Sequence, residues 1–581
     1  MDNPKRTSTI YVRENGERVY YKVVDPLVLE SLMALNRSGQ NTPFFNFFRT
    51  SKRFFTQAVT ADPAFKMANL IRDTISSVAV SPTSYNFFGN VWNGWKDTGK
   101  NSKSYASMLA GGGSFQYGHF LGNDPNKAKD LIKAGIRKEF VLDNERGHKT
   151  FLQAFNKYIT MGKKSVVKGY EGYEGFGNRL ENVNRMALYQ RLRDQGKSHL
   201  EASYEARDLM DFSLEGSWGA IHYLAQWSPF LNARLQGLYK LGRASITPGQ
   251  RAQFAVTSAA YVTASLGLYL TYKDDEDFKK REEWDRDSYH WFKIPFTDQP
   301  FRIPKVFELG AVATLAERTL EQIVDDEADG KLFMDRLWHT LTGTFAFDVR
   351  PMPLRPIMDI YANKNPFTGR DIESMKMEQM SKEKRKNAYT SETATLVSES
   401  LHSVIPWDKV TLSPVELEYL VNGYGAWVGA TVLNAVDSMV RMGEGNEAPD
   451  RGIYSLPVAG RFVERYFPDM ENRRNTKYTT RFYDQVREMN NVYNDIREMR
   501  ILSDIAGARD KADKNRMVLR YRTSYNKLRR RLSKINTMVQ RITKDPNMDG
   551  DLKTVRINRL NAIKDQLTAS LVGSASSRMN Q

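Results

Sequence analysis

Charged residues are spread along most of this chain, and one long apolar block without them predicts a helix long enough to cross a bilayer. No charged residue occurs from Ala252 to Tyr272, 21 positions closed by Arg251 and Lys273. A helix of that length rises roughly 30 Å, about the thickness of the hydrocarbon layer. Small and hydroxylated residues make the stretch only moderately hydrophobic, so two interpretations stay open: a membrane segment, and a helix packed in a large soluble assembly. The side chains that would meet lipid are Phe254, Val256, Tyr261, Val262, Leu266, Leu268, Tyr269 and Leu270.

Two stretches alternate between apolar and polar residues and predict small β-hairpins. Residues Thr9–Arg13 and Arg18–Val23 are rich in β-formers, and Asn15-Gly16 lies between them. This dipeptide favours a two-residue turn because both residues tolerate positive φ. Residues Tyr289–Ile303 predict the second hairpin, with its turn near Thr297–Gln299.

Helical periodicity dominates the rest of the chain. Asp62-Pro63 marks the start of a helix, since aspartate is a good N-cap and proline fits the first turn. Residues Leu180–Met210 predict two amphipathic helices with a hinge at Gln195–Lys197. The dense charge block Asp274–Asp287 predicts a solvated helix face, or a segment that stays in water beside an apolar helix. A second neutral stretch, Tyr419–Val436, contains three glycines, and we expect a buried hairpin or an interface there rather than a span.

The C-terminal part carries a heptad pattern, which predicts long helices packed as in a coiled coil. Apolar residues recur there at alternating spacings of three and four, and a similar pattern runs upstream from Phe482 to Ile496. We expect two or three long helices folded on each other or on neighbouring chains, and the seam is a candidate oligomer contact. The seam residues are Val518, Tyr521, Tyr525, Leu528, Leu532, Ile535, Val539 and Ile542.

The net charge narrows the classes of partner. Lysine and arginine number 85, aspartate and glutamate 68, and the formal charge is +17. Such an excess suits nucleic acid, an anionic lipid surface or an acidic partner, and a solvated basic surface explains it equally well. It peaks between Lys511 and Lys544, where twelve basic residues accompany one acid. We expect non-specific contacts with double-stranded DNA or another polyanion at Arg520, Arg522, Lys527, Arg529, Arg530, Arg531 and Lys534. The alternative is an ordinary coiled-coil face paired with acidic neighbours.

The chain contains no cysteine, which excludes structural disulfides, Cys-ligated zinc and thiol nucleophiles. The first residues, Met1–Arg6, are polar and lack the apolar run of a secretory signal. If this protein reaches a membrane, we expect it to do so without an export sequence of its own.

The sequence offers little for catalysis. The seven histidines (His119, His148, His199, His222, His290, His339 and His402) are never three or four residues apart, so no helical metal pair is expected. No phosphate-binding loop, dinucleotide fingerprint or nucleophile elbow occurs, and we expect no cofactor. Glu215, in a polar gap among aromatic residues, is the one candidate general acid, and a hydrogen-bonded structural carboxylate is the simpler interpretation.

Several short segments together resemble a large polyvalent protein-associated domain of bacteriophages, a family that also occurs in phage internal virion (DNA ejection) proteins. The segments keep their order between about residue 10 and about residue 485. They are Asp62-Pro63-Ala64-Phe65 with Asn69–Thr74, Glu181 and Arg185 with Gly196-Lys197-Ser198 and Ala206-Arg207, Ser228–Ala233 with Gln236-Gly237, Arg302–Lys305 with Phe307–Gly310, and Asn363–Arg370.

The resemblance implies a non-enzymatic virion protein that is stored with the genome and delivered ahead of it. Similar proteins of short-tailed phages build a channel across the periplasm and inner membrane, together with other ejection proteins. We therefore expect a homo-oligomer that forms part of a conduit for DNA, located in the virion before infection and in the host periplasm and inner membrane afterwards. Two alternatives stay open: a virion DNA-packing scaffold without a membrane step, and a subunit that hydrolyses cell-wall glycan through Glu215.

We expect a mainly α protein, an extended multi-helix assembly with two small β-hairpins and long coiled-coil-like helices at the C-terminus. The expected units are a β-hairpin at 1–25, a helical core at 26–250, the apolar helix at 251–273, a mixed helical region with a hairpin at 274–470, basic coiled-coil helices at 471–572 and a flexible tail at 573–581.

Overall fold

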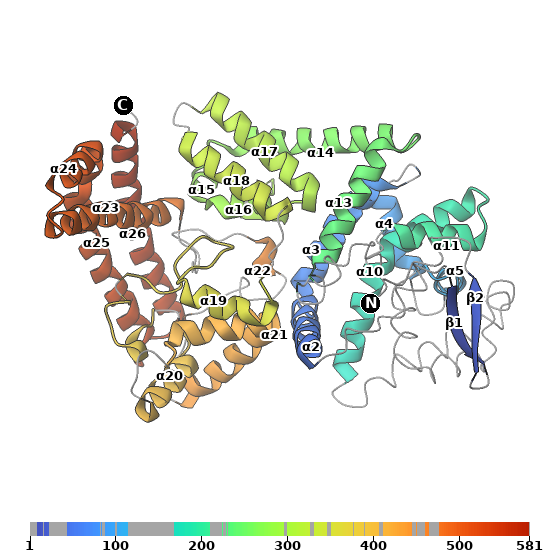
Figure 1. The fold of residues 1–581 in the computed structure, drawn as a ribbon, viewed down its shortest axis with the longest axis horizontal. Helices are drawn as coiled ribbons and strands as arrows, with labels where there is room; N and C mark the ends of the chain where they lie inside the picture. Colours follow the sequence, from blue (N-terminus) through green and yellow to red (C-terminus); the bar gives the residue numbers. More distant parts are fainter. Residues whose placement is uncertain are drawn as a thin grey trace, which may run out of the picture.

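The computed structural model is mainly helical, as expected, and its helices form three groups that follow the chain order (Figure 1). It describes residues 9–14, 17–22, 43–81, 83, 87–98, 102–113, 168–209, 224, 228, 230–295, 299–325, 330–345, 350–375, 377–387, 390–405, 411–443, 449, 459–463 and 476–579. The first group holds α2 (Pro43–Thr60), α3 (Pro63–Val80), α4 (Phe87–Asp97), α5 (Lys103–Ala110), α10 (Lys168–Asp194), α11 (His199–Asp208) and α13 (Leu231–Ile246).

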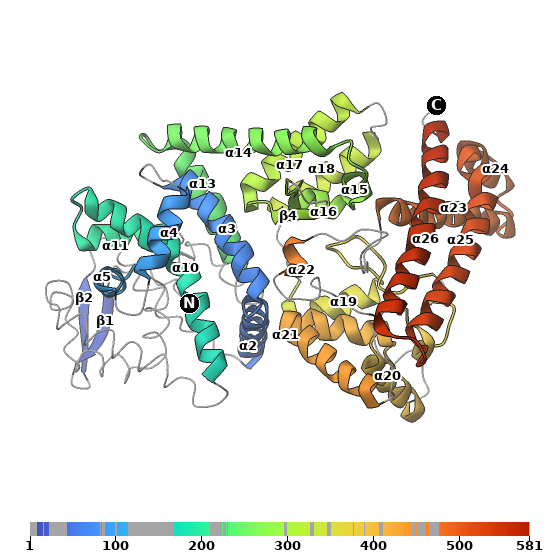
Figure 2. The same cartoon turned by 180° about the vertical axis from the view of Figure 1, so that it is seen from behind.

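The second group forms the middle of the molecule and the third its C-terminal end (Figures 1 and 2). The second comprises α14 (Arg251–Tyr272), α15 (Glu276–Lys280), α16 (Glu283–Ser288), α17 (Phe307–Val324), α18 (Gly330–Phe345), α19 (Arg355–Tyr361), α20 (Glu392–Val404), α21 (Pro414–Gly443) and α22 (Ala459–Phe462), with 3-10 turns at Met352–Leu354 and Lys382–Lys384. The third comprises α23 (Lys477–Ile501), α24 (Ile505–Lys514), α25 (Arg516–Thr543) and α26 (Gly550–Met579).

Both expected hairpins form. Strands β1 (Thr9–Glu14) and β2 (Glu17–Lys22) pair antiparallel, and the turn dipeptide between them lies outside the described residues. Strands β3 (Tyr289–Lys293) and β4 (Pro300–Pro304) form a separate two-stranded sheet. The second hairpin projects Trp291 into a cluster with Phe278 and Tyr269, which joins it to α15 and α14.

The helix ends follow the local signals in the sequence. The side chain of Asp62 accepts a hydrogen bond from the backbone N of Ala64 at 2.8 Å, which caps α3 as expected. Gly196, at φ +83°, separates α10 from α11 and adopts the left-handed conformation that this residue tolerates best. Ser198 then begins α11 with a reciprocal capping box to Glu201.

The heptad seam packs within one chain. Tyr525, Leu528 and Leu532 on α25 are buried against Phe482, Val486 and Met489 on α23 and Val572 on α26. The rings of Phe482 and Tyr525 stack with centroids 5.3 Å apart. Val518, Tyr521 and Ile535 are half-buried beside this core, and Val539 is buried further along α25. Helices α23, α25 and α26 therefore form an intramolecular bundle, and these side chains are already covered without a second chain.

The second half of the charge block, residues 281–287, is buried or half-buried, so the expected solvated face was wrong for that half, whereas Asp274, Glu276 and Lys279 in the first half are exposed. Buried charged residues there are Arg281, Glu282, Asp285 and Arg286. The block folds into two short helices, α15 and α16, instead of one continuous amphipathic helix. Its charges are buried because partners from other elements meet them, as described below.

The second neutral stretch folds back on itself. Ala426, at φ 45° and ψ −132°, breaks α21 into two halves. Both halves reach the start of α20, where the backbone N of Ser391 donates to Glu418 at 2.7 Å and that of Thr393 donates to Asp437 at 3.1 Å. A hairpin of helices forms, as expected, but no residue from 419 to 436 is buried, so the expectation of a buried hairpin was wrong on that point.

Leu532→Ala tests the intramolecular bundle. Leu532 is fully buried, so removing its side chain leaves a cavity, and we expect the free energy of unfolding to fall by about 2–5 kcal/mol in denaturant titrations. Met538→Ala, on the exposed side of the same helix, is the matched control and should change stability by less than about 1 kcal/mol. Equal losses in the two variants would contradict this packing.

Candidate functional site

Surfaces rather than an active site are the candidates here. Among the residues that the structure describes, no group of three or more His, Asp or Glu side chains is placed to hold a metal ion. Glu215 lies outside the described residues, as do His119, His148 and His222. The four remaining histidines lie in separate places: His199 beside Tyr189, His290 beside Tyr261, His339 beside Arg336 and His402 beside Glu383.

Helix α14 runs along one edge of the molecule with one side in contact and one side free (Figures 1 and 2). Its inner side packs on α3, α13, α17 and β3. It is the one described helix that is long and apolar enough to span a bilayer, and only 11% of its apolar 18-residue stretch is buried. Its exposed side carries no charge between the terminal Arg251 and Lys273, and consists of Ala252, Ala255, Val256, Ala259, Ala260, Thr263, Ala264, Gly267, Leu270 and Thr271.

The expected lipid-facing residues divide between the two sides. Val256 and Leu270 are exposed. Tyr269 is buried beside Phe278 and Trp291, and Phe254 and Tyr261 pack against a cluster around Val306 and Leu309. Val262, Leu266 and Leu268 are half-buried. The outer face is therefore made of small residues, while most large apolar side chains of this helix already contact protein.

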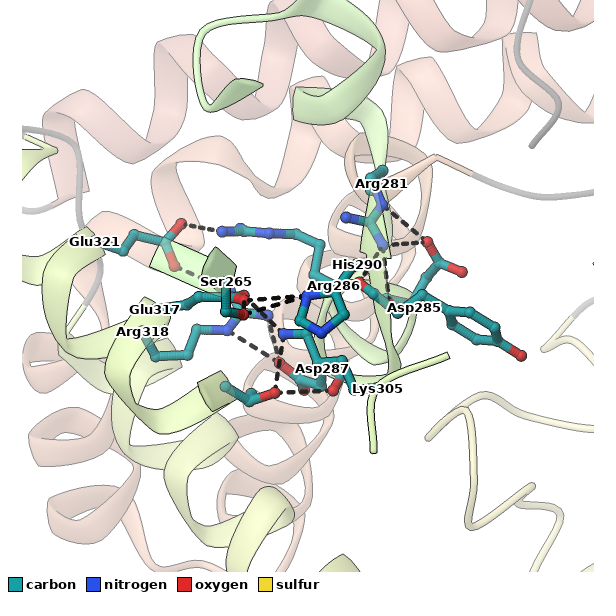
Figure 3. Close-up of polar contacts among 12 residues, drawn as sticks. Ser265, Arg281, Asp285, Arg286, Asp287, His290, Lys305, Glu317, Arg318 and Glu321 are labelled. Carbon is teal, nitrogen blue, oxygen red and sulfur yellow. Dashed lines mark hydrogen bonds and ion pairs between the residues drawn. The ribbon is translucent and has the colours of Figure 1, made fainter. Parts of the chain in front are cut away.

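A buried chain of hydrogen bonds fastens the inner side of α14 (Figure 3). The Tyr261 hydroxyl lies 2.8 Å from His290 Nε2, and Ser265 Oγ lies 3.2 Å from His290 Nδ1. Ser265 also donates to Glu317 on α17. Lys305 Nζ donates to the other oxygen of Glu317 at 2.7 Å. We call Tyr261, Ser265, His290, Lys305 and Glu317 the α14 latch.

The α14 latch contains a serine, a histidine and a carboxylate, but its geometry is structural. Ser265 is only 1% exposed, so a substrate would not reach its hydroxyl. The hydroxyl donates to Glu317 rather than to His290, whereas a nucleophilic serine donates to its base. Burial lowers the pKa of His290 to about 3, and the positive charges of Lys305 and Arg281 act in the same direction. A neutral His290 thus joins α14 to β3 and α17.

Asp285 lies at the centre of a second buried group. Arg281 Nε donates to one Asp285 oxygen at 2.9 Å, and Arg302 pairs with the other. All three side chains are about 2–3% exposed. Arg281 also donates to the carbonyl oxygen of Tyr289 at 3.1 Å, and Arg302 to that of Arg461 at 2.9 Å. One carboxylate therefore joins the end of α15, α16, β4 and α22.

A neighbouring buried group surrounds Arg318 on α17 (Figure 3). Arg318 pairs with Asp287 at 2.7 Å, Glu283 at 2.8 Å and Glu321 at 3.0 Å. Burial alone would raise the pKa of Asp287, but the charges of Arg318 and Arg336 outweigh burial and hold that pKa below its ordinary value. The carboxylates stay ionised and fix α16, α17 and α18 together.

Helix α25 presents a continuous basic face to solvent. Five of the seven expected anion-contact residues are exposed on it: Arg520, Lys527, Arg530, Arg531 and Lys534. The other two turn inward, because Arg522 lies over the ring of Tyr493 at 3.5 Å and Arg529 is half-buried beside Tyr483. Arg516 and Arg541, which the sequence analysis did not select, extend the same face.

None of these seven exposed cations makes an ion pair with another described residue. The face from Arg516 to Arg541 is roughly 38 Å long at the helical rise. Helix α25 contains no acidic residue between its ends, so nothing on the helix itself offsets the charge. We call these seven residues the α25 basic face. Helical spacing would have identified the two added residues. Arg516 lies four residues before Arg520, and Arg541 lies seven residues after Lys534, so both fall on the same side of the helix.

An apolar groove of about 430 Å³ lies between α25 and α26 next to this face. It is lined by Met538, Ile542, Leu560 and Ile563, with the arginines Arg541, Arg556 and Arg559 around them. The last residue of the expected seam, Ile542, therefore lines a surface groove instead of the bundle core.

The α14 latch makes stability depend on pH. The folded pKa of His290 lies below its value of 6.5 in an unfolded chain, so the stabilising contribution is complete above pH 6.5 and declines as pH falls toward 3. From pH 7 to 5, we expect wild type to lose about 2 kcal/mol more unfolding free energy than His290→Asn, measured by denaturant titration at each pH. Parallel pH profiles for the two proteins would contradict a neutral, buried His290.

Asp285→Ala should leave two buried guanidinium groups without their carboxylate. We expect a loss of about 3–5 kcal/mol in unfolding free energy, because removing one partner of a buried pair leaves an uncompensated charge. Asp274→Ala is the matched control, since Asp274 pairs with Lys273 but is largely exposed, and stability should stay close to wild type. A mild effect of Asp285→Ala would show that water or rearrangement solvates the arginines.

Comparison with known proteins places one part of the chain. No curated protein and no solved structure matches the chain. Residues 275–459, about a third of the chain, match the family model described as large polyvalent protein associated domain 38. This segment holds the Asp285 and Arg318 groups, the second hairpin and helices α15 to α21, and most of the α14 latch. The match supports the resemblance to a phage-associated protein, and it covers those quoted segments that lie between Arg302 and Arg370.

Proposed function

We propose that the protein is a structural, non-enzymatic component of a bacteriophage virion that binds DNA and self-associates into part of a conduit for genome delivery. The α25 basic face is the observation that carries this proposal. It offers seven unpaired cations in a line, which suits the regularly spaced phosphates of double-stranded DNA. The match of residues 275–459 to a phage-associated domain family supports the setting.

Charge placement explains why a nucleic acid is the favoured partner of α25. Cations elsewhere in the molecule are often used internally, as Arg281, Arg302 and Arg318 are. Those on α25 face solvent, and the bundle core fixes the opposite side of the helix against α23 and α26. A rigid, exposed row of charges releases counterions from DNA without first breaking protein contacts, so non-specific and salt-dependent binding follows.

The proposal includes contact with the bacterial inner membrane through the outer face of α14. Full insertion of α14 would break the α14 latch, because Ser265 and Tyr261 would leave their partners His290 and Glu317 and would themselves enter lipid without those hydrogen bonds. Contact by the uncharged outer face alone leaves the α14 latch intact. We therefore propose that α14 lies against the bilayer while its inner side stays fastened to β3 and α17.

A second candidate function is a DNA-packing scaffold in the virion with no membrane step. The α14 latch favours it, because the inner side of the apolar helix is held by its own chain through buried hydrogen bonds. Flotation with liposomes that contain anionic lipid separates the two candidates. The conduit proposal expects flotation that is lost in Ala260→Asp, on the outer face of α14, while the scaffold expects none.

DNA binding is tested by the dependence of affinity on salt. We expect the logarithm of the binding constant to fall linearly with the logarithm of salt concentration. Neutralising five residues of the basic face to glutamine should lower the magnitude of that slope by up to about 4.5, since each phosphate contact contributes about 0.9. The five residues are Arg520, Lys527, Arg530, Arg531 and Lys534.

The control removes the same net charge elsewhere. Five exposed cations outside α25 are changed to glutamine, namely Lys96, Arg191, Arg251, Lys364 and Arg497. The control should keep most of the wild-type slope. Equal slopes for the two variants would mean that only net charge matters, and the assignment to α25 would fail.

A further inference from the structure

The second half of α21, residues 427–443, turns its charged side chains inward and its apolar side chains outward. Asp437 and Arg441 are buried, and Arg441 Nε lies 2.9 Å from an Asp437 oxygen. The other oxygen of Asp437 accepts the backbone N–H of Thr393 at 3.1 Å. Glu392, at the start of α20, lies 3.9 Å from Arg441 and also pairs with Lys544 at 3.1 Å. The charges of this helix are thus used inside the molecule.

The outward side chains of α21 form a regular apolar stripe. Val428, Val432, Ala435, Met439 and Met442 follow one another at spacings of four, three, four and three, and all are exposed. Val432 is 57% exposed and Met439 71% exposed. We call these five residues the α21 seam. This spacing is the one by which a helix presents apolar side chains to a second helix, and the seam has no such partner among the described residues.

The seam lies in an uncharged surface, which selects the partner. The exposed residues between its members include Thr431, Asn434 and Ser438, and none from 427 to 443 exposes a charge. Two copies of a chain with a formal charge of +17 repel each other, so they approach most easily where no charge is exposed. An acidic partner would find no cation here. Lipid would have to cover the polar side chains of Thr431, Asn434 and Ser438 together with the apolar ones, whereas a protein surface in water tolerates them.

The order of side chains along the seam suits a two-fold pair. Ala435 is the middle member, with Val432 and Val428 on one side and Met439 and Met442 on the other. In an antiparallel pair around a two-fold axis, Ala435 of one copy meets Ala435 of the other. The two valines of each copy then meet the two methionines of the other copy. A small residue at the crossing point lets the two helices come close. Helix α21 lies at the lower edge of the molecule in Figure 1, where a second copy has access.

We propose that the α21 seam is the contact through which two copies of this chain pair around a two-fold axis at Ala435. The inference rests on the self-association part of the proposed function and names its surface. The second half of α21 exposes ten residues, fewer than the roughly 20–30 per partner of a standard interface. The pair therefore forms and dissociates with protein concentration. Helix α20, which packs on α21, also exposes the apolar side chains of Val397, Leu401 and Val404.

The absence of cysteine from the chain allows a direct test. Ala435→Cys introduces a single thiol, which meets its own copy only at a two-fold contact. Under mild oxidation, we expect a covalent dimer to form at least about tenfold faster than with Thr263→Cys, because pairing raises the effective concentration of the two thiols. Thr263 is exposed on the uncharged outer face of α14, away from the seam, and provides the matched control. Equal rates for the two variants overturn the proposal.

A second measurement does not depend on disulfide geometry. Val432→Glu and Met439→Glu change exposed side chains, so the fold should be kept, as circular dichroism will show. Each should weaken the dimer by roughly tenfold or more in sedimentation equilibrium, since burial of one such side chain is worth that factor. Three results would overturn the proposal. The wild-type chain could stay monomeric, or both variants could leave the dimer intact. The third is a monomeric chain that binds vesicles and loses this binding in Val432→Glu.

The salt dependence of DNA binding is measured on the same variants. It reports on the α25 basic face, which none of these substitutions touches. If cross-linking fails while the DNA slope is unchanged, the two-fold contact is wrong and the DNA-binding part of the proposed function stands. If Ala435→Cys cross-links but the salt slope does not depend on the α25 basic face, the two-fold contact stands and the DNA-binding part of the proposed function is wrong.

Discussion

Asp285 lies between the guanidinium groups of Arg281 and Arg302 in the interior of the molecule, and neither arginine would be stable there without it. The same residues reach well beyond α16. Arg302 donates to the carbonyl oxygen of Arg461, whose own side chain pairs with Asp62 at the N-cap of α3. A single buried carboxylate thus connects the middle group of helices to the first group. Its partners lie on short helices and a two-stranded sheet, elements that would hold no fixed position on their own.

Burying so many charges leaves apolar residues for the outside. Helix α14 gives its polar Ser265 and Tyr261 to the latch and exposes alanine, glycine and valine. The second half of α21 buries Asp437 and Arg441 and exposes the α21 seam. Two helices in different parts of the molecule have the same inversion. A monomer in water gains nothing from such faces, since exposed apolar stripes are typical of surfaces that meet a partner or a membrane.

Local signals in the sequence predicted what depends on local physics. The cap at Asp62, the hinge at Gly196, both hairpins and the heptad helices all appear, because each follows from the conformational preference of a few residues. The second half of the charge block at 274–287 was misjudged because its partners, Arg302, Arg318 and Arg336, lie far along the chain, and no periodicity indicates them. The α25 face was predicted in most of its members. Two predicted residues, Arg522 and Arg529, do not belong to the face, and Arg522 stacks on Tyr493 instead. Position within the three-helix bundle decides which cations turn inward, and the sequence alone does not show it.

Helix α25 shows how packing decides what the molecule offers to others. Its heptad residues are covered by α23 and α26, so a surface that resembled an oligomer contact in the sequence is no longer available for one. The same packing fixes the phase of the helix and aligns Arg516 to Arg541 on the opposite side. A chain that displays an unpaired basic ridge repels its own copies along that ridge. Self-association then requires a surface without charge, and among the described residues α14 and α21 provide such surfaces, at opposite edges of the molecule (Figure 1).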